Sequence, residues 1–162
     1  YLLKHPTSIH TLSFAFAEAG VPFLEPEDFG RSENQAIFER IRRGAELGAL
    51  QSLEEFLAGV DETLEEHLEA MLEWDARQPQ VSEDEISEDL VRCALRLKAR
   101  SLRQNLERVY FLLREPAEAE DALQMGEYGR LVREHSQALQ HISRTLHARS
   151  MAGRREHLEP GT

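Results

Sequence analysis

Histidine and glutamate are the side chains in this chain that could hold a metal ion, since seven histidines accompany 30 acidic residues. All-helical proteins that bind two iron or manganese ions present Glu-x-x-His pairs on facing helices. No histidine here has a glutamate three positions before it, and the even spacing of His135, His141 and His147 scatters these three around a helix. We therefore expect no metal ion and no other cofactor in this chain.

Other catalytic motifs are also missing from the sequence. It contains no glycine-rich phosphate loop and no serine or cysteine nucleophile motif. Four glutamates share one face of a predicted helix, and we interpret them as a solvated acidic surface: Glu62, Glu66, Glu69 and Glu73. We expect that this fragment is not an enzyme by itself.

A row of arginines is the first feature that could bind a partner. It lies on one stripe of a long predicted helix and consists of Arg92, Arg96, Arg100 and Arg103. The row could contact phosphate groups, or it could be a solvated or ion-paired face opposite acidic helices. We favour the second interpretation.

The segment RVYFLLRE, from Arg108 to Glu115, is the second such feature. It points four large apolar side chains in four directions around a helix, and a two-helix hairpin can bury only about one of them. Either the connection at 116–127 folds over the others, or they form a protein-docking tip. The candidate partner-binding residues are Tyr110, Phe111, Leu112, Leu123, Met125 and Tyr128.

The composition favours helices. The chain has 23 leucines and 17 alanines, whereas valine, isoleucine and threonine total only 16.

The single cysteine, Cys93, excludes an internal disulfide framework and a multi-thiolate zinc site, so a reducing cytoplasm is the simplest location. No apolar run approaches the ~20 residues that span a bilayer, and we expect no membrane contact. Because the sequence begins at Tyr1, within an expected helix, we interpret it as part of a longer protein.

Charge divides the chain into two parts. Residues 1–89 carry 6 basic and 21 acidic side chains, whereas residues 90–162 carry 13 basic and 9 acidic ones. Such asymmetry suggests two subdomains with different surfaces. Phosphate groups would repel the acidic part, so we expect no strong direct binding to nucleic acid.

Helix starts are well marked in the first part. Capping boxes are predicted at Ser32, Ser52 and Ser82, and Asp61 is a further candidate N-cap. Between glycines and prolines, these starts predict helices at 8–19, 33–47, 53–58 and 62–77, after a helix remnant at 1–4. The predicted core is Phe14, Phe16, Phe29, Ile37, Phe38, Ile41, Phe56, Leu57, Leu68, Met71 and Leu72.

A long helix should follow, because no proline or glycine intervenes from Ser82 to Arg114. Its two apolar stripes indicate that its start completes the bundle and its end pairs with something else. Leu95 lies where the stripes overlap and should be among the most buried leucines.

A partner for this helix is visible downstream, after Pro116 and a turn-prone stretch around Gly126 and Gly129. Apolar residues recur there in steps of four and three, with His135 in register, as in a coiled-coil seam: Tyr128, Val132, Leu139, Ile142 and Leu146. We predict antiparallel arms at 99–114 and 120–150.

The fold that these elements predict is all-α. A compact multi-helix bundle at 1–98 would be followed, through the long shared helix, by an antiparallel helical hairpin at 99–152 and a flexible tail at 153–162.

The order YLLKHP, PEDF and SENQAIFERI is similar to that of two bacterial replication domains that share a fold. One is the N-terminal domain of the replicative helicase, and the other is the C-terminal helicase-binding domain of DnaG-type DNA primase. The second half, ISEDLVRCALRLKARSLRQNLERVYFLLRE followed by a heptad helix, resembles the primase domain. The resemblance covers roughly the whole chain, although the glycines at 126 and 129 depart from it.

The resemblance implies a function. It implies a module that docks primase on the N-terminal domains of the hexameric helicase for primer synthesis, with the catalytic domains elsewhere in the protein. A helicase domain would tend to self-associate into rings, whereas the primase module should be monomeric when isolated. A nucleic-acid-binding helical domain that uses the arginine row is the other alternative.

Overall fold

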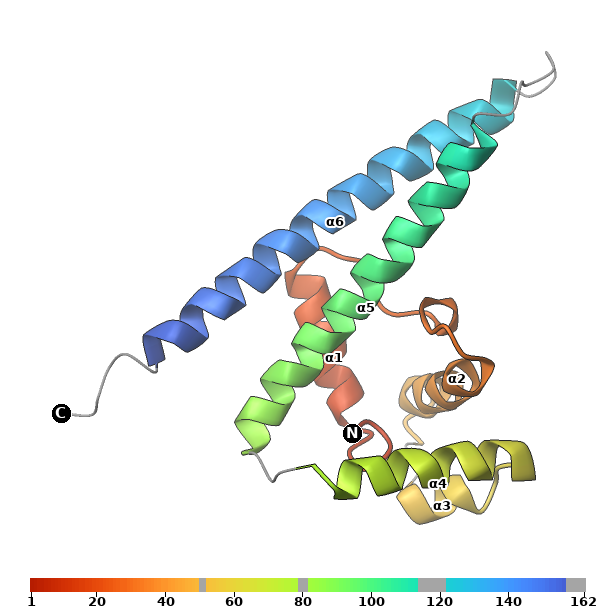
Figure 1. Ribbon diagram of the computed structural model, residues 1–162, viewed down its shortest axis with the longest axis vertical. Coiled ribbons are helices and arrows are strands. Elements are labelled where there is room, and N and C mark those ends of the chain that lie inside the picture. Colours follow the sequence, from red (N-terminus) through yellow and green to blue (C-terminus); the bar gives the residue numbers. More distant parts are fainter. Residues whose placement is uncertain (50–51, 79–81, 114–121, 157–162) are drawn as a thin grey trace. The chain divides into compact units, whose positions relative to one another are not determined.

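The computed structural model describes residues 1–49, 52–78, 82–113 and 122–156. Within these ranges the chain is all-α, with six α-helices, one short 3₁₀-helix and no strand. The elements are α1 (Ser8–Glu18), η1 (Pro26–Asp28), α2 (Ser32–Glu46), α3 (Leu53–Leu57), α4 (Glu62–Ala76), α5 (Glu83–Leu112) and α6 (Ala122–Glu156), and Figure 1 shows their order. The predicted all-α fold is therefore confirmed.

Three of the predicted helix caps form. The Ser52 hydroxyl accepts a hydrogen bond from the backbone N–H of Glu55 at 3.2 Å, and the Glu55 carboxylate accepts one from the Ser52 N–H at 2.9 Å. The same reciprocal pair joins Ser82 and Glu85, and the Asp61 carboxylate accepts from Leu64 N–H at 2.9 Å. These bonds satisfy N–H groups that the first turn of a helix leaves without partners.

The predicted capping box at Ser32 is wrong. Ser32 is already the first helical residue, its N-cap is Arg31, and its hydroxyl contacts the neighbouring Glu33 carboxylate. The Gln35 side chain instead donates to the carbonyl of Phe29 at 2.7 Å, which ties the start of α2 to the end of η1. Asp28 in η1 is buried and accepts from the Glu25 N–H at 2.8 Å, so this stretch acts as a structural brace.

Contacts divide the chain into two compact units. Unit 1 consists of Tyr1–Ala15 and Leu24–Cys93, and unit 2 consists of Phe16–Phe23 and the chain from Ala94 onward. The helices α1 and α5 each contribute residues to both units.

Unit 1 is held together by an apolar core and a few polar links. Its buried residues include Leu12, Leu24, Phe38 and Leu68, each at most 2% exposed. The side chains of His67 and Asn34 meet at 2.8 Å and link α4 to α2. The Lys4 ammonium donates to the Asp75 carboxylate, and this hydrogen bond lowers the pKa of Asp75.

Two residues of the predicted core are exposed instead. Phe14 is 73% exposed and Met71 is 36% exposed. At about 100° per residue, Phe14 lies roughly 200° from Leu12, on the side of α1 that faces away from the core. The other predicted members were Ile37, Phe38, Ile41, Phe56, Leu68 and Phe16, which are buried, and Phe29, Leu57 and Leu72, which are half-buried.

Tyr1–Lys4 do not form the predicted helix remnant. They form a turn in which the N–H groups of Lys4 and His5 both donate to the carbonyl of Tyr1, at 3.0 and 2.9 Å. Leu3 is buried nevertheless, so the turn contributes to the core of unit 1.

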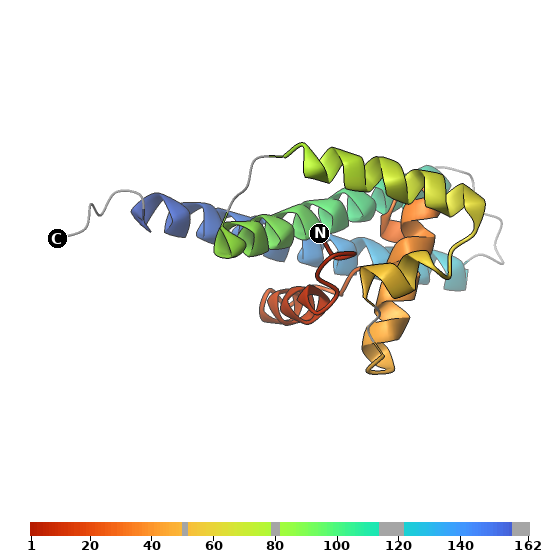
Figure 2. The same ribbon diagram turned by 90° about the horizontal axis from the view of Figure 1, so that it is seen from below.

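Unit 2 is built on a pair of antiparallel helices. Residues 94–112 of α5 and the helix α6 run in opposite directions side by side in both views (Figures 1 and 2). The inward residues are buried: Leu95, Ala99, Leu102 and Val109 on α5, and Ala138 and Ile142 on α6. The predicted seam residues Tyr128, Val132, His135, Leu139 and Leu146 are half-buried. Leu95 is 0% exposed, which confirms the prediction that it is among the most buried leucines.

The end of α1 belongs to unit 2 and closes with a glycine. Gly20 has φ +64°, its N–H donates to Ala17, and the Val21 N–H donates back to the Phe16 carbonyl at 3.0 Å. This is a Schellman motif, whose left-handed position glycine adopts without steric cost. The His141 ring lies 3.3 Å from the Gly20 carbonyl oxygen and links this turn to α6.

Gly126 and Gly129 do not form the predicted turn. Both lie inside α6, which begins at Ala122. Likewise, α6 continues through Gly153 to Glu156, so the predicted tail does not begin at 153, and residues 157–162 lie outside the described ranges. A glycine destabilises a helix by only about 1 kcal/mol relative to alanine. Packing and the neighbouring helical turns can offset this cost, so the glycines do not interrupt α6.

Gly126→Ala should stabilise the protein by about 0.5–1 kcal/mol. A Cβ at this position would meet nothing within 4 Å, so the gain in helix propensity should appear without a steric cost. Gly20→Ala is the matched control. There the φ of +64° is unfavourable for alanine, and a Cβ would lie 3.1 Å from His141 Nδ1. Urea denaturation should show opposite signs for the two variants, and destabilisation by Gly126→Ala would contradict the helical assignment.

Candidate protein-docking site

The last turn of α5 is anchored by two residues that face inward. Val109 is 7% exposed and Leu113 is half-buried. The Leu113 N–H donates to the Val109 carbonyl at 2.9 Å, which keeps the turn helical up to its end. Residues four positions apart lie on the same face of a helix, so the three residues between them must point elsewhere.

Those three residues are large and apolar, and all of them are exposed. Tyr110 is 49% exposed, Phe111 is 66% exposed and Leu112 is 43% exposed. Single exposed apolar side chains are ordinary, but three in succession leave the end of α5 apolar around the part of its circumference that the hairpin does not cover. We refer to Tyr110, Phe111 and Leu112, together with Met125, as the hairpin tip.

The first turns of α6 supply the other predicted residues. Met125 is 40% exposed, whereas Tyr128 is half-buried. The Leu123 side chain lies outside the part of the chain that the structure describes. Residues 116–121 of the connection, which the alternative interpretation places over the tip, also lie outside it, whereas residues 122–127 belong to α6.

Polar residues border the tip. An open depression beside Phe111 and Leu112 is lined also by Gln104, Glu107 and Arg108. An apolar centre with a polar rim is the usual arrangement of a protein–protein interface. The tip therefore has the chemical character of a docking surface.

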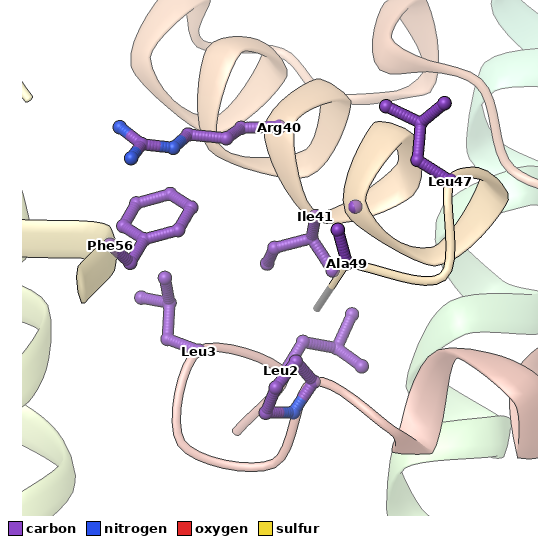
Figure 3. A pocket seen from close by; sticks show the side chains of 9 residues that line it. Leu2, Leu3, Arg40, Ile41, Leu47, Ala49 and Phe56 are labelled. Carbon is purple, nitrogen blue, oxygen red and sulfur yellow. The ribbon is translucent and has the colours of Figure 1, made fainter. Parts of the chain in front are cut away.

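The structure contains a second apolar surface, which the sequence analysis missed. A cavity of about 240 Å³ in unit 1 lies between the first residues of the chain, α2 and α3 (Figure 3). The Arg40 guanidinium covers the Phe56 ring at 4.5 Å and donates to the Gly59 carbonyl at 2.7 Å. The lining residues are Leu2, Leu3, Pro6, Arg40, Ile41, Gly44, Leu47, Ala49 and Phe56. Its walls come from three separate segments, so no local sequence pattern could have indicated it.

Within the described ranges, the histidines and glutamates considered as metal ligands are not brought together. Glu62, Glu66, Glu69 and Glu73 are all exposed on α4. Among the described residues, no three histidine, cysteine, aspartate or glutamate side chains are placed to hold a metal ion. The His135 ring is half-buried and its Nδ1 meets no hydrogen-bond partner among the described residues, whereas His141 and His147 are exposed.

The arginine row is only partly ion-paired. Arg92 contacts the carboxylates of Asp89 at 2.8 Å and Glu88 at 3.9 Å. Arg96, Arg100 and Arg103 are exposed. Arg92 is therefore ion-paired within its own helix rather than with an opposite acidic helix, and the other three arginines of the row are solvated.

Comparison with known proteins adds no relative, because no protein-family model, no curated protein and no solved structure matches this chain. Over the described ranges, every helix is either too short or too polar to cross a membrane. The functional interpretation therefore depends on the geometry above and on the sequence resemblance.

Proposed function

We propose that this chain is the helicase-interaction module of a bacterial DNA primase and that it acts by binding rather than by catalysis. The observation that carries the proposal is the hairpin tip, where Tyr110, Phe111 and Leu112 are all more than two-fifths exposed on one turn. Interfaces draw most of their energy from a few aromatic or large apolar anchors, and the tip offers three in succession.

The proposed role follows from this surface and from the resemblance of the sequence. The tip would dock on the N-terminal domains of the hexameric replicative helicase in the bacterial cytoplasm. A helical hairpin suits this task, since its two long arms can present a small apolar end without exposing the core between them. Docking would hold the catalytic part of the primase where primers are needed on unwound DNA.

Two measurements on the purified chain test the proposal. Isothermal titration with the replicative helicase of the source organism should show saturable binding, because the tip is available without a change in fold. Multi-angle light scattering on the chain alone should give a monomer of 18.6 kDa. Absence of binding to the helicase would overturn the proposal.

The N-terminal domain of the helicase itself is the alternative that the sequence resemblance leaves open. That domain would assemble into rings, so a hexamer in light scattering would favour it over the primase module. The two candidates thus differ in a measurement that requires no partner protein.

A further inference from the structure

Three arginines on α5 form an unneutralised row in unit 2. Arg96, Arg100 and Arg103 are exposed, and none of them makes an ion pair with any carboxylate in the described part of the chain. They follow each other at intervals of four and three residues and therefore share one helical face, over about 10 Å of helix axis.

Two of the arginines on α2 are neutralised within their own helix, whereas Arg133 and Arg144 on α6 are exposed, make no ion pair within the described part of the chain and lie eleven residues apart. Arg42 and Arg43 on α2 both contact the Glu39 carboxylate at 2.8 Å, which lowers the pKa of Glu39. Arg77 and Arg130 also face glutamates four residues away. The row on α5 instead sets three arginines, without ion pairs in the described ranges, at spacings of four and three residues. Like charges at these spacings repel one another, and each pair costs a helix a few tenths of a kcal/mol. A polyanion bound along the row would relieve that repulsion.

An aromatic side chain continues the row. Tyr110 lies two turns beyond Arg103, about 20° away around the helix, and is 49% exposed. Glu107 stands between them on the same face, is exposed, and limits the basic row to three residues. Proteins that bind single strands combine cationic side chains, which follow the phosphates, with aromatic rings, on which bases stack.

From this arrangement we infer that the face of α5 formed by Arg96, Arg100, Arg103 and Tyr110 binds the backbone of a single-stranded nucleic acid. The acidic side chains of residues 1–89 make the interaction weak, so its affinity lies in the high micromolar range at moderate salt. This face shares Tyr110 with the hairpin tip, but nucleic-acid binding requires no helicase, so it can be tested independently of the proposed helicase function.

Salt dependence gives the first test. A labelled oligothymidylate titrated with the whole chain should show a fluorescence-anisotropy change at low salt. Three phosphate contacts on a single strand predict a slope of about −2 in log K against log salt, so affinity should fall roughly 20-fold between about 50 and 200 mM. A slope near zero would overturn the inference.

Substitution gives the second test. The triple variant R96Q/R100Q/R103Q should weaken oligonucleotide binding at low salt by at least about tenfold and remove most of the slope. The control R130Q/R133Q/R144Q on α6 removes the same charge from exposed arginines elsewhere and should change affinity by no more than about twofold. Equal losses in the two variants would show a diffuse charge effect and overturn the site.

Competition separates nucleic acid from an acidic protein segment. A polyglutamate peptide of equal charge should displace the oligonucleotide poorly, because it has no bases to stack on Tyr110. Displacement as effective as that by unlabelled oligothymidylate would instead assign the row to acidic peptides. Circular dichroism of both triple variants should match that of the parent chain, because all six positions are exposed.

Discussion

Leu95→Ala should lower the free energy of unfolding by about 2–5 kcal/mol. Leu95 is 0% exposed, so truncation removes apolar contacts and leaves a cavity in a closely packed region. The residue lies near the middle of α5, where the long helix passes from one compact unit to the other. The loss should be measured by urea denaturation followed by circular dichroism.

Leu112→Ala provides the matched control for this prediction. It removes the same atoms from the same helix, but the side chain is 43% exposed, so the loss should stay below about 1 kcal/mol. A loss in the free energy of unfolding below about half a kcal/mol for Leu95→Ala would contradict the prediction. It would show that Leu95 does not fix α5 in the core at this position.

The helices of this chain could be predicted from local chemistry. Ser52, Asp61 and Ser82 each cap the helix that they were expected to start, because the capping bond depends only on residues three positions apart. Ser32 has the same pattern and does not cap, since Gln35 bonds the Phe29 carbonyl instead. The Phe29 carbonyl, which draws the Gln35 side chain away from the cap, lies in the preceding turn. A capping pattern covers only the four residues from Ser32 to Gln35, so it could not predict this bond.

Burial was harder to predict than helix type. Phe14 and Phe16 are both aromatic residues of α1, yet Phe14 is 73% exposed and Phe16 is 1% exposed. They lie about 200° apart on the helix, so only one of them can face a core on a given side. Both residues were predicted to be buried because both are apolar. Their positions around the helix decide which of the two is buried.

The candidate docking site could be predicted in part. The exposure of Tyr110, Phe111 and Leu112 follows from the angles of consecutive residues on a helix whose seam takes Val109 and Leu113. The cavity beside Arg40 and Phe56 could not be predicted, because it forms where segments distant in sequence meet. Local periodicity describes one helix at a time and contains no such information.

Phe111→Ala should weaken binding to the replicative helicase by roughly 30-fold while leaving the helical content nearly unchanged. An interface anchor of this type contributes about 2 kcal/mol or more, and each ~1.4 kcal/mol is tenfold in affinity. Phe111 is 66% exposed in the free chain, so its truncation should cost the fold little. Isothermal titration gives the affinity, and circular dichroism gives the helical content.

Phe14→Ala is the control that isolates the hairpin tip. Phe14 is 73% exposed on α1, so the same ring is removed from a comparably open position that lies outside the tip. Its effect on helicase affinity should remain within about twofold, which is less than ~0.5 kcal/mol. If Phe111→Ala instead reduces helical content and the affinity falls only in proportion, Phe111 is internal packing of the hairpin. The helicase contact would then have to be sought on unit 1, where the cavity beside Arg40 is one apolar alternative.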